Sequence, residues 1–159
     1  EKYAFPLQIF FLNKRFEMYK DSMHHPASIM DRSIVEDRIF AKMLRDQGEL
    51  NDKEYDIYVD LFNNMMEHVN PPTLMVYLRI KTENVIERIK RRGRKYELEQ
   101  SINYWYDLNS NYEVFFGEYS WSKLLVIDVD NLDFVNNPND KDYIIDLIEN
   151  NVGIPEGVS

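Results

Sequence analysis

The sequence predicts an α/β fold in which buried parallel strands alternate with helices. Short apolar runs without polar alternation, at residues 73–80 and 124–129, are typical of strands that are covered on both faces. Longer segments with apolar residues at helical spacing precede and follow these runs. A sheet of this kind binds its ligand beyond the carboxyl ends of its strands, so we expect the functional site there.

The composition excludes several classes of protein. The chain has 159 residues, of which 44% are hydrophobic and 30% charged, and this indicates a folded protein. Its formal net charge of −9 argues against general nucleic-acid binding, because a phosphate backbone repels an acidic surface. No apolar run is long enough to cross a bilayer, so we expect no membrane segment. The lack of cysteine fits a reducing compartment, and we expect the cytoplasm.

The first predicted elements are a helix and a strand. Apolar residues recur at helical spacing over residues 3–23 and predict an amphipathic helix, which His24-His25-Pro26 ends. The short apolar run at residues 27–30 predicts a buried strand. This strand would deliver Asp31 and Arg32 to its carboxyl end, where a ligand is expected.

Two further helices are predicted before the central strand. Residues 35–46 have an apolar face, and Gln47-Gly48 ends that helix. Residues 52–69 form the next helix, for which Asn51 and Glu54 make a capping arrangement.

The second half of the chain continues the alternation of strands and helices. The strand at residues 73–80 leads to a helix that Thr82 caps and Gly93 ends. Residues 94–100 are charged and lack periodicity, which predicts a mobile loop. The remaining expected elements are a helix at 101–116, a strand at 124–129, a polar loop at 130–140, a helix at 141–150 and an unstructured tail at 153–159.

Two charged segments point to phosphoryl transfer. Asp31 and Arg32 form an acid–arginine pair, and the segment from Arg88 to Lys95 is rich in arginine around Gly93. A carboxylate of this kind can hold Mg²⁺, and arginines can neutralise a phosphoryl group during its transfer. The alternatives are a structural salt bridge for the pair and a solvated charged face for the basic segment.

Gln8 and Arg15 are candidates for recognition of a nucleobase. Arg15 follows Gln8 by about two helical turns, so both side chains can lie on one face of the first helix. A carboxamide offers a donor and an acceptor side by side, which complements the edge of a base. The alternative for Gln8 is a polar residue on the helix surface, but its neighbours Leu7, Ile9 and Phe10 are apolar.

On these residues the chain resembles the deoxynucleoside kinase family, and the bacterial purine deoxynucleoside kinases most of all. The resemblance covers residues 5–148 and rests on separate motifs in the family's order. They are Phe5-Pro6-Leu7-Gln8 with Arg15, Asp31-Arg32-Ser33 with Asp37, Arg88 to Arg94 with Glu97, and Asp128 to Phe134. The resemblance implies a P-loop NTPase-like parallel sheet flanked by helices, with a kinase domain at residues 1–152 and a tail at 153–159.

Two parts of the family's machinery do not occur in these residues. The family has a glycine-rich phosphate loop and a catalytic glutamate, and it places both before the helix that carries Gln8. The chain begins abruptly at Glu1. We therefore expect that an amino-terminal part of the kinase domain is missing from this sequence.

The resemblance also implies a role for each candidate residue. Gln8, Arg15 and Asp37 would read the base, Phe40 would stack on it, and Glu97 would bind the 3′-hydroxyl of the sugar. Arg32, Arg92 and Arg94 would stabilise the transferring phosphoryl group, and Asp31 would help to hold Mg²⁺. Arg88, Asp133 and Phe134 would contact the adenine of ATP. Phe40 and Phe134 have a simpler alternative, since each could be an ordinary core phenylalanine.

The function implied is transfer of the γ-phosphoryl group of ATP to the 5′-hydroxyl of a purine-preferring deoxynucleoside in nucleotide salvage. The cofactors are ATP and Mg²⁺, dA or dG is the expected substrate with dC as a further candidate, and a homodimer is expected. Two alternatives stay open. A nucleoside monophosphate kinase of the thymidylate type would need more basic groups to receive the acceptor's phosphate. A non-catalytic partner subunit would be favoured by a chain that truly begins at Glu1.

Overall fold

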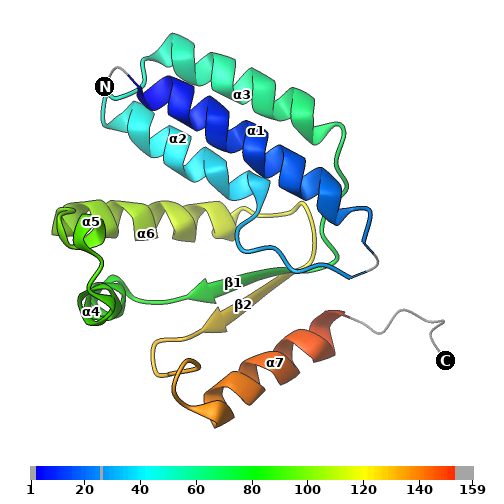
Figure 1. Ribbon diagram of the computed structural model, residues 1–159, viewed down its shortest axis with the longest axis vertical. Helices are drawn as coiled ribbons and strands as arrows, with labels where there is room; N and C mark the ends of the chain where they lie inside the picture. The colour runs from blue at the N-terminus through cyan, green and yellow to red at the C-terminus, as the bar shows by residue number, and fades with distance from the viewer. Residues whose placement is uncertain (1–2, 26, 153–159) are drawn as a thin grey trace. The chain divides into compact units, whose positions relative to one another are not determined.

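The computed structural model of the chain describes residues 3–25 and 27–152. It divides into two compact units, with the boundary between Asn70 and Pro71. The first unit is helical, and the second combines helices with a parallel sheet (Figure 1). None of the described helices is both long and apolar enough to span a membrane. Pro26 and the tail predicted at residues 153–159 lie outside the described residues.

Three helices that pack against one another build the first unit. Its elements are α1 (Ala4–Ser22), the short 3₁₀-helix η1 (Ile34–Glu36), α2 (Asp37–Asp46) and α3 (Asp52–Met66). Helix α1 contacts both α2 and α3, and these two contact each other. Their shared core contains Leu12, Ile34, Ile39, Leu50, Tyr58 and Phe62. Full burial of a side chain such as Leu12 contributes about 1.5–3 kcal/mol to folding.

The helix predicted at residues 3–23 is confirmed, but its predicted amphipathic pattern is only partly correct. The buried residues of α1 are Gln8, Leu12 and Tyr19, which lie on one face. Phe10 and Met18, which belong to the apolar pattern that predicted this helix, are each 54% exposed. The apolar residues therefore lie on all sides of the helix, and the polar Gln8 shares the buried face with Leu12 and Tyr19.

The buried strand predicted at residues 27–30 is wrong. These residues form no strand, and Ile29 is fully exposed. A strand needs a hydrogen-bonded neighbour, and no strand of the described chain pairs with this segment. The segment is instead an irregular connection that leads to Asp31.

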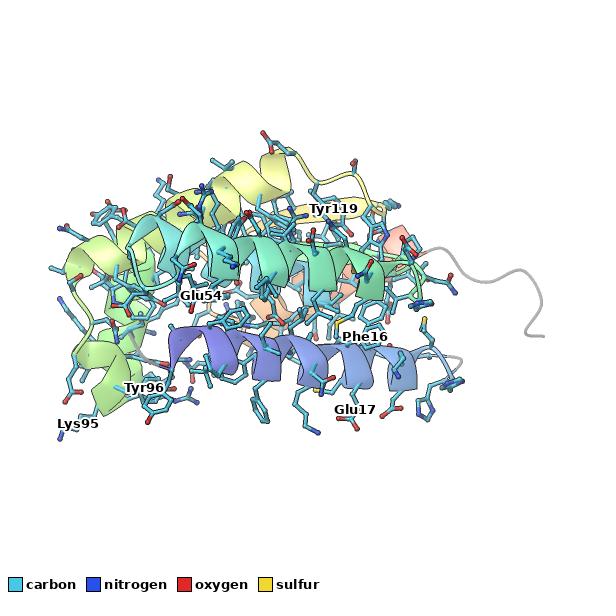
Figure 2. The ribbon with its side chains drawn as sticks, turned by 90° about the horizontal axis from the view of Figure 1, so that it is seen from above. Phe16, Glu17, Glu54, Lys95, Tyr96 and Tyr119 are labelled. Carbon is cyan, nitrogen blue, oxygen red and sulfur yellow. The ribbon has the colours of Figure 1, made fainter. Side chains whose placement is uncertain are left out.

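The starts of the following helices agree well with the sequence. The predicted capping arrangement of α3 is confirmed, because the Glu54 N–H donates to Asn51 Oδ1 at 2.9 Å and the Asn51 N–H donates to Glu54 Oε2 at 3.0 Å. Figure 2 marks Glu54 at the start of this helix. The predicted helix at residues 35–46 begins as η1, where Ser33 Oγ accepts from the Val35 N–H at 3.1 Å, and continues as α2.

The second unit confirms the predicted α/β class with a parallel sheet. Strands β1 (Met75–Arg79) and β2 (Leu124–Asp128) pair in parallel, with Tyr77 opposite Val126. The helices are α4 (Thr82–Arg92), α5 (Lys95–Leu98), α6 (Ile102–Gly117) and α7 (Pro138–Val152). Helix α6 packs on β1, where the rings of Tyr77 and Phe116 stack with centroids 4.2 Å apart. Helix α7 contacts β2 on the other side of the sheet (Figure 1).

The two strands are less buried than their sequences predict. Leu78 on β1 and Val126 on β2 are each 40% exposed, although apolar runs of this kind are typical of strands covered on both faces. Within the described residues each strand has a neighbour on one side only, so each has an open edge.

The prediction that Thr82 caps α4 is wrong. Lys81 is the N-cap residue, and its side chain makes no capping hydrogen bond. Thr82 Oγ1 accepts instead from Asn109 Nδ2 at 3.0 Å, so it links α4 to α6. The Lys81 N–H donates to Asp130 Oδ1 at 2.8 Å, and this carboxylate from the loop after β2 holds the start of the helix.

The mobile loop predicted at residues 94–100 is wrong in part. The one-turn helix α5 occupies residues 95–98, and Glu97 is buried within it. Figure 2 shows the side chains of Lys95 and Tyr96 extending away from this turn. The sequence has no periodicity here because one helical turn is too short to display it.

Helix α7 begins earlier than predicted. We expected it from Lys141, but it starts at Pro138, where proline is favoured because the first helical turn needs no N–H from it. Asn137 Oδ1 accepts from the Asn139 N–H at 3.1 Å, so Asn137 caps the helix. The Asn-Pro pair was the signal that the sequence reasoning missed.

Candidate functional site

The first unit holds an ion pair between the predicted base-reading residues Arg15 and Asp37. Arg15 Nε lies 3.7 Å from Asp37 Oδ2, and the two side chains are 19% and 8% exposed. Arg15 Nη1 also donates to the Asp31 backbone oxygen at 3.1 Å. Arg15 therefore joins α1 both to the start of α2 and to the segment before η1. Gln8 lies on the buried face of the same helix, so the alternative of a surface residue is wrong.

Burial dominates the electrostatics of the carboxylates at the start of α2. It raises the pKa of Asp37, while the nearby charges of Arg15 and Arg32 oppose this rise. Burial also raises the pKa of Glu36, and the charge of Arg32 is the largest effect that opposes this rise. Although Asp37 Oδ2 pairs with Arg15, no described residue donates a hydrogen bond to it. A buried acceptor in this state can receive a donor from a ligand.

Arg32 has an unusual backbone conformation. Its φ of 69° is the only positive φ among the described residues that are not glycine. This left-handed conformation costs about 1–2 kcal/mol for a residue with a side chain. Such strain is concentrated at functional sites, where the surrounding structure holds it in place. The Arg32 guanidinium lies over the Phe40 ring, 4.7 Å from its centroid.

Asp31, the predicted Mg²⁺ residue, is exposed next to this strained position. Among the residues that the structure describes, no three carboxylate or histidine side chains gather as a metal cluster. A site built on one carboxylate still fits Mg²⁺, because this ion keeps several waters and takes the rest of its ligands from substrate phosphates.

The second unit brings Arg92, Arg94 and Glu97 together. Arg92 Nη2 donates to both carboxylate oxygens of Glu97 at 2.7 Å, and Arg94 Nη1 lies 3.7 Å from Glu97 Oε1. Burial acts to raise the pKa of Glu97, but the hydrogen bonds and charge of Arg92 outweigh it, and the pKa is lowered. Both arginine side chains are about half exposed, so one carboxylate holds two accessible guanidinium groups side by side.

Arg88 is tied to the loop that follows β2. Its Nη2 donates to the backbone oxygens of Val129 at 2.6 Å and Leu132 at 2.8 Å. Its guanidinium lies over the Phe134 ring, 5.8 Å from the centroid. Asp133 in the same loop accepts from Asn136, and this lowers the pKa of its carboxyl group. The predicted adenine-binding residues Arg88, Asp133 and Phe134 thus lie in one cluster.

The structure therefore groups the candidate residues other than Gln8 into three local sets. The first set is Arg15, Asp31, Arg32, Asp37 and Phe40. The second is Arg92, Arg94 and Glu97, and the third is Arg88, Asp133 and Phe134. Two buried polar groups, Glu36 and the Tyr58 hydroxyl, were not singled out from the sequence. Glu36 could have been found as the acid that precedes Asp37, but nothing in the sequence distinguishes Tyr58 from the other tyrosines.

Comparison with known proteins extends this picture to almost the whole chain. A family model described as deoxynucleoside kinase matches residues 1–153. The chain is 35% identical over 157 residues to a deoxyguanosine kinase of Lactobacillus acidophilus, covering 93% of this chain and 69% of that protein. It is 34% identical over 152 residues to a deoxyadenosine/deoxycytidine kinase of Bacillus subtilis, covering 93% of this chain and 70% of that protein.

The solved structures give the same result. The structure of a deoxyadenosine kinase from M. mycoides with bound dATP superimposes with a TM-score of 0.79 at 32% identity. The match covers 93% of this chain and 75% of that one. The same enzyme with bound dCTP superimposes with a TM-score of 0.77 over 94% of this chain and 74% of that one, at 31% identity. The chain belongs to the deoxynucleoside kinase family.

Proposed function

We propose that the protein transfers the γ-phosphoryl group of ATP to the 5′-hydroxyl of a deoxynucleoside, with dA or dG preferred and dC a weaker substrate. Relatives named as deoxyguanosine and deoxyadenosine/deoxycytidine kinases support this range of substrates. The observation that carries the proposal is the buried Asp37 carboxylate, which is paired with Arg15 and has an oxygen that accepts no hydrogen bond from the described residues. The alternative of a monophosphate kinase is not favoured by these relatives.

In this proposal Gln8, Arg15 and Asp37 read the base. The Asp37 carboxylate accepts a hydrogen bond from an amino or ring N–H group of the base, which a purine and cytosine both offer. Arg15 favours the charged form of that carboxylate, because a positive charge 3.7 Å away opposes the rise in pKa that burial causes. Gln8 supplies a donor and an acceptor from the buried face of α1. Phe40 packs against the base, and Arg32 covers its ring before the substrate enters.

Phosphoryl transfer breaks the bond between the γ-phosphorus and the bridging oxygen, which leaves on ADP, and forms a bond from that phosphorus to the 5′-oxygen. The 5′-hydroxyl gives its proton to a base, a role that the family resemblance assigns to a glutamate that does not occur in these residues. Arg32, Arg92 and Arg94 stabilise the negative charge of the phosphoryl group in this step. Glu97 accepts from the 3′-hydroxyl of the sugar, and its pairing with Arg92 couples sugar binding to placement of that guanidinium. Mg²⁺, held in part by Asp31, neutralises phosphate charge when it is bound.

The remaining parts of the proposal concern ATP, assembly and location. Arg88, Asp133 and Phe134 contact the adenine, supported by their position in one cluster at the loop after β2. Residues 1–152 form the kinase domain. A homodimer, which follows from the family resemblance, and a cytoplasmic location, which fits the lack of cysteine, complete the proposal.

The test of base reading is Asp37→Ala. We expect the ratio of kcat/KM between the best and the poorest of dA, dG, dC and dT to fall at least about tenfold, while the KM for ATP changes little. The matched control is Asp46→Ala at the other end of α2, where the carboxylate is 49% exposed and pairs with Lys42. Equal losses for all four nucleosides and for ATP would contradict the assignment.

A further inference from the structure

Two buried side-chain atoms of the described residues have no hydrogen-bond partner, and both belong to the first unit. They are Asp37 Oδ2 and the Tyr58 hydroxyl. Asp37 is 6% exposed and Tyr58 is fully buried. Polar groups are seldom left in this state inside a protein, so each calls for an explanation. The two atoms are complementary, because the carboxylate oxygen can only accept and the phenol can donate.

The packing of α2 on α3 places these two residues in the same part of the first unit. Arg38, which follows Asp37, lies over the Phe62 ring at 5.1 Å from its centroid. Phe62 comes one helical turn after Tyr58, so both side chains lie on the face of α3 that meets the first turn of α2. The two residues also interact electrostatically. Burial raises the pKa of the Tyr58 hydroxyl most, and the Asp37 carboxylate adds to this rise, so the phenol keeps its proton.

We propose that Tyr58 is a positioning residue for base recognition, whose hydroxyl donates a hydrogen bond to the Asp37 carboxylate, directly or through one water molecule, in the substrate complex. This inference rests on the proposed function, which gives Asp37 the task of reading the base. A carboxylate turns easily about its last side-chain torsion, because that torsion has broad energy wells. A donor from the core holds the carboxylate in one orientation, and the lone pairs that this hydrogen bond leaves free then face the base.

The competing explanation is purely structural. The Tyr58 ring would fill the core between α2 and α3, and its hydroxyl would be a tolerated cost of using tyrosine there. Tyr58→Phe separates the two explanations, because it removes the hydroxyl and keeps the ring. If the hydroxyl is only tolerated, Tyr58→Phe should be at least as stable as the wild type, with unchanged selectivity among nucleosides. A positioning hydroxyl predicts changed selectivity whatever happens to stability.

The experiment measures kcat/KM of the purified protein for dA, dG and dC, and binding of the same nucleosides by calorimetry. We expect Tyr58→Phe to lower the ratio between the best and the poorest of these substrates about tenfold, which corresponds to about 1.4 kcal/mol. The variant should have a higher KM for the nucleoside and a weaker affinity for it, with the KM for ATP unchanged. The matched control is Tyr55→Phe on the same helix, whose ring lies under Arg45 at 5.0 Å, and its ratio should equal that of the wild type.

A double-mutant cycle with Asp37→Asn tests whether Tyr58 acts through Asp37. If it does, Tyr58→Phe has no further effect on the ratio once Asp37 is replaced. A wild-type ratio in Tyr58→Phe, or an equal loss in both backgrounds, would overturn the inference and leave the proposed function intact. A wild-type protein that neither binds nor phosphorylates any of the nucleosides would overturn the proposed function, and this inference with it.

Discussion

Removal of the Arg15 charge should destabilise the protein in a manner that depends on pH. The variant is Arg15→Met, which keeps the apolar stem of the side chain. Two unit charges 3.7 Å apart interact by about 4.5 kcal/mol at an effective dielectric constant of about 20, and by about 1 kcal/mol in water. Since Arg15 is 19% exposed, solvent screens the pair in part, and we expect a loss of about 2 kcal/mol. Loss of the hydrogen bond to the Asp31 oxygen adds about 1 kcal/mol.

The two contributions differ in their pH dependence. Burial already raises the pKa of Asp37 above its unfolded value, so folding becomes less favourable as pH rises through the folded pKa. Arg15 opposes this effect, and its removal raises the pKa further. Below the unfolded pKa, Asp37 is protonated in both states, and only the hydrogen-bond loss remains. The difference in unfolding free energy from the wild type should therefore grow from about 1 kcal/mol near pH 3 to about 3 kcal/mol at neutral pH.

Urea unfolding followed by far-ultraviolet circular dichroism measures this difference at each pH, because the first unit is helical. The control is Lys14→Met on the same helix, where Lys14 pairs with Glu17 at 2.8 Å and both side chains are more than half exposed. This exposed pair should contribute nothing measurable. A difference for Arg15→Met that does not increase with pH, or an equal loss in the control, would refute the reasoning.

Three further outcomes are expected. Glu36→Gln should be more stable than the wild type at pH 8 and lose this advantage toward acid pH, because burial raises the pKa of Glu36 and its charged form opposes folding. A difference in unfolding free energy, measured with urea, that stays constant with pH would contradict this. Gly93→Ala should lose about 1 kcal/mol of stability, because φ is 72° there and no atom lies near the added Cβ, whereas Gly117→Ala at the end of α6 should lose none. Arg92→Gln should lower kcat about 100-fold with a smaller effect on the nucleoside KM, as steady-state kinetics would show; an unchanged kcat would exclude it from the transfer step.

The sequence predicted the elements whose signals are local. The capping box of α3, the glycine that ends α4 and the long helical pattern of α1 depend on neighbouring residues alone, and the structure confirms them. The strand predicted at residues 27–30 was wrong because strand formation depends on a hydrogen-bonded neighbour, which no local pattern can supply. The exposure of Phe10 and Met18 on α1 could not be predicted for a similar reason, since tertiary surroundings decide which face of a helix is buried.

The candidate site could be predicted in part. The resemblance named residues that the structure finds in local contact, such as Arg92 with Glu97 and Arg15 with Asp37. It gave no indication of the left-handed conformation of Arg32, because such strain is held by the fold around it. It also did not reveal that the Tyr58 hydroxyl lacks a partner, since hydrogen-bond satisfaction is a property of the packed core.

The most direct test of the account is the reaction itself. The purified protein is incubated with ATP and Mg²⁺ and, in separate reactions, with dA, dG, dC, dT or dTMP, and the products are identified by mass spectrometry. The account predicts ADP together with the 5′-monophosphate of dA or dG in the highest yield, a lower yield from dC, and no diphosphate from dTMP. Phosphorylation of dTMP in preference to every nucleoside, or no phosphorylation of any nucleoside, would contradict it.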